Sequence, residues 1–98
     1  AWIEGIAAAR AGWPSLTRGA RSPLLAAADL YVYARHLDGE VTLVVLNRGG
    51  AVDGRAVPLG ALGGGDFQPL VGDATATADG NGVRLSVPAG EAAILGRR

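Results

Sequence analysis

The stretch LYVYARHLDGEVTLVVLNR, residues 30–48, contains two strand patterns with the turn that joins them. Asp38-Gly39 predicts a tight hairpin turn, because Asp and Gly tolerate the positive φ that such turns require. Before the turn, in residues 30–35, aliphatic side chains alternate with tyrosine and arginine. This period of two is typical of a half-buried strand. After it, residues 41–46 are apolar at nearly every position, which predicts a central strand with both faces covered.

Further strand patterns lie on both sides of this hairpin, separated by Gly, Pro, Asp and Asn. They cover residues 24–27, 55–59, 66–71, 74–77, 83–87 and 92–95. Pro69 favours an edge position for its strand, and residues 60–65 are predicted to form a flexible loop. Short strands at regular spacing predict a mainly β chain, an antiparallel Greek-key β-sandwich of seven to eight strands.

The first residues follow a helical pattern instead. Apolar side chains recur at spacings of four, three and four at Trp2, Ile6, Ala9 and Trp13. We therefore expect one N-terminal amphipathic helix over residues 2–11, which Gly12 and Pro14 would end. Its apolar stripe requires a partner, either the sheet that follows or a larger body.

Length and composition exclude several functions. The chain has 98 residues, room for one domain but not for a catalytic α/β barrel of about 250 residues. Nine basic residues, all arginine, balance nine acidic ones along the chain, which argues against nucleic-acid and membrane partners. Without cysteine there is no thiol nucleophile, thiolate metal site or disulfide.

The polar residues of the hairpin do not form a convincing catalytic set. His36 is the only histidine, and no serine stands in a nucleophile-elbow context. We interpret it as a solvated strand residue. Asp38 and Glu40 suggest a pair of glycosidase carboxylates, but a hairpin tip is convex and wet, so we interpret both as solvated turn residues.

Two binding patterns are weaker alternatives. Tyr31 and Tyr33 lie two apart on one strand face, so they are candidates for stacking a sugar, although packing also explains them. Asp73, Asp79 and Asn81 resemble only a fragment of a calcium loop. We predict no catalytic residue, no metal site and no cofactor.

Several strings along the chain, taken in order, resemble one known family. They are PSLTRG at 14–19, YAR at 33–35, DGE at 38–40, VVLNR at 44–48, VPL at 57–59 and VPAG at 87–90. Together they resemble the C-terminal domain of the α-amylase superfamily, glycoside hydrolase family 13, in the branch of neopullulanases, maltogenic amylases and α-glucosidases. The glycine-rich residues 60–77 depart most from that family.

The resemblance implies a non-catalytic β-sandwich at residues 20–98 that packs on the catalytic (β/α)8 barrel of an α-glucan-processing enzyme. Residues 1–19 would be the last barrel helix and a connector, with Trp2, Ile6 and Trp13 packing on the barrel. No catalytic residue can be carried over, because the family's acids lie on barrel strands. A fragment without its barrel is expected to self-associate through exposed apolar surface. The alternative is a carbohydrate-binding or adhesion-type sandwich.

Overall fold

The fold is described from a computed structural model, over residues 12, 13, 15, 19–37, 39–63 and 65–97. Within this part of the chain, β1 is Ala20–Ala26, β2 Leu30–Leu37, β3 Glu40–Asn47, β4 Val52–Pro58, β5 Gln68–Val71, β6 Thr75–Asp79, β7 Gly82–Val87 and β8 Ala92–Arg97. A short 3-10 helix, η1, spans Gly60–Leu62. No helix in these residues has the length and apolarity to cross a membrane.

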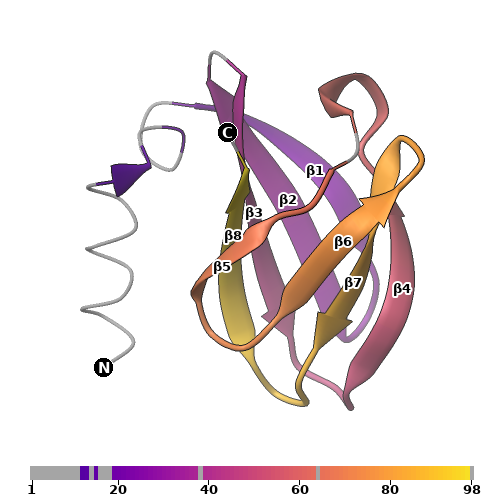
Figure 1. Cartoon of the computed structure of the whole chain (residues 1–98). Coiled ribbons are helices and arrows are strands. Elements are labelled where there is room, and N and C mark those ends of the chain that lie inside the picture. The colour runs from indigo at the N-terminus through magenta and orange to yellow at the C-terminus, as the bar shows by residue number, and fades with distance from the viewer. Residues whose placement is uncertain (1–11, 14, 16–18, 38, 64, 98) are drawn as a thin grey trace.

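The strands form two antiparallel sheets that face each other as two layers (Figure 1). The five-stranded sheet has the order β1-β2-β3-β8-β5, and the three-stranded sheet has the order β4-β7-β6. The last strand of the chain, β8, therefore lies between β3 and β5. Because chain neighbours often lie in different sheets, the two layers are tied together at several connections.

The β2–β3 hairpin determines which side chains enter the core. Its register pairs Val32 with Val45 and Ala34 with Leu43, and Leu43 is paired in turn with Leu95 on β8. Directly paired residues of antiparallel strands lie on the same face of the sheet. All five of these side chains are 0% exposed.

The core lies between the two layers. From the three-stranded sheet, alternate residues of β7 point inward at Val83, Leu85 and Val87, while Arg84 is exposed on the outer face. Val57 of β4 and Ala76 of β6 belong to the same buried cluster. Burial of aliphatic side chains from both sheets supplies the main stabilisation of the fold.

Asn47, at the end of β3, ties together two turns at one end of the sandwich. Its side-chain amide donates to the carbonyl oxygens of Gly50 and Pro88, at 3.0 Å each, and its Oδ1 accepts from the Gly49 amide at 3.1 Å. The side chain is only 4% exposed, so its hydrogen bonds satisfy a buried amide. Asn47 therefore has a structural role.

The expectation of a mainly β sandwich is confirmed, as is the edge position of Pro69, which lies on the outermost strand β5. β3 is central in its sheet, as predicted, yet Leu46 on it is 41% exposed. The prediction that both faces of this strand are covered is therefore wrong at Leu46. The expected helix over residues 2–11 lies outside the described residues.

Shortening Leu43 tests the central position of β3 in the core. We expect Leu43→Ala to lower the free energy of unfolding by about 2–5 kcal/mol, because a fully buried leucine leaves a cavity between the sheets. Urea unfolding followed by circular dichroism gives the value. Thr77→Ala, at an exposed position of β6, is the control and should change stability by less than about 0.5 kcal/mol. Equal effects would contradict the assignment of the core.

Candidate functional site

The most elaborate polar arrangement holds the segment before β1 against the outer face of the β2–β3 hairpin. We call it the connector clamp, and it consists of Ser15, Gly19, Arg35, Glu40 and Thr42. Arg35 Nε donates to the Ser15 carbonyl at 3.1 Å, and Arg35 Nη2 donates to the Gly19 carbonyl at 3.1 Å. One guanidinium thus holds two backbone positions of the connector.

Ser15 is the most buried residue of the clamp on the connector side. Its amide donates to Glu40 Oε2 at 2.7 Å, and its hydroxyl lies 3.1 Å from the Thr42 hydroxyl. Thr42 Oγ1 also donates to the Arg35 carbonyl at 3.3 Å, so the Ser15 hydroxyl is the donor to Thr42. Both hydroxyl residues are 0% exposed. Buried hydrogen bonds of this kind define a single position for the connector.

The local sequence explains why the clamp forms. Arg35 and Thr42 are direct partners in the β2–β3 register, so they share a face of the sheet. Gly19 must lack a side chain, since a Cβ there would lie 2.5 Å from the Ser15 carbonyl oxygen and 2.9 Å from that of His36. Sequence reasoning missed this site. The sequence signal for it is an arginine and a threonine that share the outer face of a hairpin. A connector that contains a serine and a glycine precedes that hairpin.

The clamp corrects the interpretation of Glu40. We expected a solvated turn acid, but Glu40 is half-buried at the start of β3 and accepts a hydrogen bond from a backbone amide 25 residues earlier. A carboxylate at the end of a hairpin is not necessarily wet when another segment packs across it. Its partner in the proposed carboxylate pair, Asp38, lies outside the described residues.

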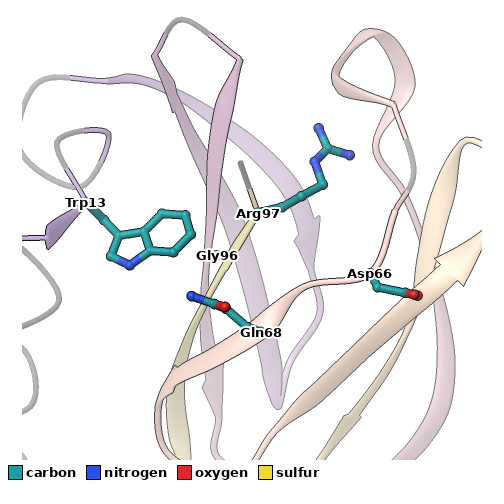
Figure 2. A pocket seen from close by; sticks show the side chains of 5 residues that line it. All are labelled: Trp13, Asp66, Gln68, Gly96 and Arg97. Carbon is teal, nitrogen blue, oxygen red and sulfur yellow. The ribbon is translucent and has the colours of Figure 1, made fainter.

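Trp13 packs on the same outer face, beyond the clamp. Figure 2 shows its indole directed at Gly96 of β8, and a Cβ on Gly96 would lie 2.7–2.9 Å from three ring carbons. The ring is 6% exposed and shares an apolar cluster with Val71 and Ile94. Trp13 was predicted to pack on a barrel, and Trp2 and Ile6, predicted with it, lie outside the described residues.

A pocket of about 260 Å³ lies beside Trp13 and is lined also by Asp66, Gln68, Gly96 and Arg97. Its charged groups are engaged elsewhere, as Figure 2 shows for Arg97, which points toward the loop before β5. The Arg97 guanidinium donates to the carbonyls of Leu62 and Gly63 at 2.8 Å each, and Asp66 accepts from the Ala78 amide at 2.7 Å. These polar groups diverge, whereas a ligand site needs them to converge.

The sugar-stacking candidates Tyr31 and Tyr33 do lie together, with ring centroids 5.6 Å apart and ring planes at 46°. Arg21 of β1 covers one face of the Tyr33 ring. Its guanidinium carbon lies 4.2 Å from the centroid of the Tyr33 ring, and Nη2 donates to the Tyr31 hydroxyl at 2.6 Å. A cation over the ring uses the same π face that a sugar would need.

The remaining candidates do not form a catalytic or metal-binding group. His36 is half-buried, and its Nε2 lies 3.3 Å from the Ser22 hydroxyl. Asp79 forms an ion pair with Arg84 at 3.4 Å. The Asp73 amide donates to Glu91 Oε1 at 2.5 Å. Across the residues that the structure describes, no three His, Asp or Glu side chains are grouped as a metal ion would need.

Comparison with known proteins identifies the fold. No protein-family model matches the chain, and no curated protein matches it by sequence. Among solved structures, a debranching enzyme of Nostoc punctiforme superposes with a TM-score of 0.79 at 26% identity, over 95% of this chain and 19% of the enzyme. The chain matches one domain of α-amylase-superfamily enzymes.

Two further enzymes contain a domain of the same fold. CldA, a cyclomaltodextrin glucanotransferase with a three-domain ABC distribution, gives a TM-score of 0.73 at 23% identity over 97% of this chain and 21% of its own. The structure of AmyP in complex with maltotriose gives a TM-score of 0.71 at 20% identity, over 91% of this chain and 18% of AmyP. The chain thus spans about a fifth of the length of each enzyme. The predicted resemblance is confirmed, and a domain of this kind makes up a minor part of such enzymes.

Removing one acceptor tests the clamp. In Glu40→Ala, the Ser15 amide loses a charge-assisted hydrogen bond, an interaction of about 1.5–3 kcal/mol, so its hydrogen exchange should accelerate at least about tenfold. Exchange followed by NMR reports this amide directly. Glu91→Ala is the control, because Glu91 accepts from the Asp73 amide elsewhere. Unchanged protection of Ser15 in Glu40→Ala would show that the carboxylate does not hold the connector.

Adding a methyl group to Gly96 tests the seat of Trp13. Gly96→Ala should push the indole off β8 and shift its fluorescence emission to longer wavelength, because the exposed ring meets water. The measurement uses a Trp2→Phe background, which leaves Trp13 as the only tryptophan. Gly50→Ala is the control, since a Cβ at Gly50 meets no atom within 4 Å. Identical spectra of the two variants would place Trp13 elsewhere.

Proposed function

We propose that this chain is the non-catalytic C-terminal β-sandwich of an α-glucan-processing glycoside hydrolase, and that it packs on the enzyme's catalytic (β/α)8 barrel. The observation that carries the proposal is the match of 95% of the chain to 19% of a debranching enzyme. In this proposal, residues 1–19 form the last barrel helix and connector, and residues 20–98 form the sandwich. The partner is the barrel of the same polypeptide.

The site geometry supports a structural role. Glu40, Asp66 and Glu91 each accept a hydrogen bond from a backbone amide. Asp79 pairs with Arg84, and His36 lies against a serine hydroxyl, so these groups do not converge on one cleft. Hydrolysis of a glycosidic bond needs two carboxylates about 5–10 Å apart across a sugar. The connector clamp uses Glu40 to hold the chain that enters the sandwich. The domain would therefore act through the position that it imposes on the preceding segment.

The physical function would be to cover apolar surface of the barrel and to restrain its last helix. A restrained helix stabilises a barrel because the segment cannot fray without breaking the clamp. The parent acts on α-glucosidic bonds with residues of the barrel, and this domain contributes no reacting group. Damage to the sandwich would then lower the stability of the whole enzyme before it lowers the catalytic activity.

Activity of two chains tests the proposal. The complete polypeptide should hydrolyse or transfer maltooligosaccharides or an aryl α-glucoside, and the 98-residue chain alone should do neither. Chromatography of the sugar products and release of the aryl group measure both reactions. Turnover by the clean 98-residue chain, or a complete polypeptide without any activity on α-glucosidic bonds, would contradict the proposal.

A further inference from the structure

A pocket of about 400 Å³ lies between the β1–β2 and β3–β4 connections, away from the pocket beside Trp13. Its volume falls in the range of about 300–1,000 Å³ that is typical of small-molecule sites. Leu30 and Val52 line it from the edge of the core, together with three exposed alanines of the two connections. No described residue that lines it is aromatic. The pocket therefore offers an aliphatic wall of modest size.

Hydrogen bonds hold both connections that form this pocket. The Ala27 amide donates to the Leu30 carbonyl at 2.9 Å, and the Arg48 amide donates to the Asp29 carbonyl at 2.7 Å. The β3–β4 connection is fixed by the side chain of Asn47, which also lines the pocket. The pocket is thus largely pre-formed, as most small-molecule sites are.

Asp29 brings a carboxylate to the rim of the pocket. A Cβ on Gly49 would lie 2.8 Å from the Asp29 Cβ and 3.1 Å from its Oδ2, so the glycine lets the acid lie directly against the β3–β4 connection. Within the described residues, the Asp29 carboxylate has no hydrogen bond or ion pair. Packing therefore sets the position of this group while its acceptor sites stay available.

Arg55 brings the opposite charge from the other sheet. The pairing of β4 with β7 shifts register between Val52 and Arg55, where Gly54 has a φ of 67°. Irregularities of this kind re-aim the side chains that follow them. Arg55 is paired with the buried Leu85, so it lies on the core side of the edge strand β4, and its long side chain is exposed.

The Arg55 guanidinium, like the Asp29 carboxylate, has no hydrogen bond or ion pair within the part of the chain that the structure describes. A charge on the core side of an edge strand also prevents that strand from pairing with another chain. That protective role explains Arg55 alone. It does not explain why an acid without a partner lines the same pocket from the opposite sheet.

We propose that this pocket binds a small zwitterion of the amino-acid type. Arg55 binds the carboxylate of the ligand, Asp29 binds its ammonium group, and its aliphatic side chain lies on Leu30 and Val52. Two opposite charges without partners match a ligand that carries both charges, because each then forms a charge-assisted hydrogen bond. A neutral sugar offers no charge to either group. This site is separate from the proposed function and does not depend on it.

Titration of the ¹⁵N-labelled chain with L-valine, followed by NMR, tests the site. The amides of Asp29, Gly49 and Ala51 should shift saturably, with a Kd of about 1–10 mM because both charged groups are exposed. Isovalerate lacks the ammonium group and isobutylamine lacks the carboxylate, so each should bind at least about fivefold more weakly than L-valine.

Two variants assign the charges. Arg55→Gln and Asp29→Asn should each weaken L-valine binding at least about fivefold. Arg48→Gln is the matched control, because Arg48 is exposed beside the pocket without lining it, and it should bind L-valine as the parent chain does. The dispersion of the NMR spectrum reports folding, and Arg55→Gln decides by itself if Asp29→Asn unfolds.

Three results would overturn the site. The first is an absence of saturable shifts with L-valine. The second is equal binding of L-valine and of the two ligands that carry a single charge. The third is binding of maltose as tightly as L-valine, which would assign the pocket to a neutral sugar.

Discussion

The structure depends on β3, a strand that carries apolar side chains on both faces. One face supplies Leu43 and Val45 to the core between the sheets. The other supplies Thr42, Val44 and Leu46 to the outer surface. A strand of this kind must be central, because an edge position would leave its apolar residues and its backbone groups unpaired. The same eight-residue strand therefore contributes both to the core and to the outer face of the five-stranded sheet.

The connector clamp links the sandwich to the chain before it. In many multidomain proteins the segment between domains is exposed and few contacts cross it. Here Ser15 is fully buried, and three side chains of one hairpin hold it and Gly19. The positions of Ser15 and Gly19 on the sandwich are thus set largely by hydrogen bonds between hairpin side chains and backbone groups of the connector. This arrangement suits a domain whose contribution is geometric.

Several polar residues gained a structural explanation in place of a chemical one. Asn47 satisfies two turn carbonyls, Arg97 two loop carbonyls, and Glu40 a connector amide. Each lies at a strand end, where the ladder stops and the backbone groups of loops need partners. Placed in a sequence, the same residue types suggest catalysis or metal binding. The direction in which each side chain points and the groups that it contacts decide between a structural and a catalytic role. Side-chain direction and contacts are properties of the folded chain.

The sequence by itself determined the strands, the hairpin at residues 30–48, the edge position of Pro69 and the family resemblance, because alternation, turn residues and motif order are local properties of the chain. Only the tertiary structure decided that Arg35 and Glu40 hold Ser15, that Arg21 covers Tyr33, and that Leu46 stays exposed on a central strand. Each of these contacts joins residues on different strands or segments. Sheet order and register set their distances, and no local pattern encodes either.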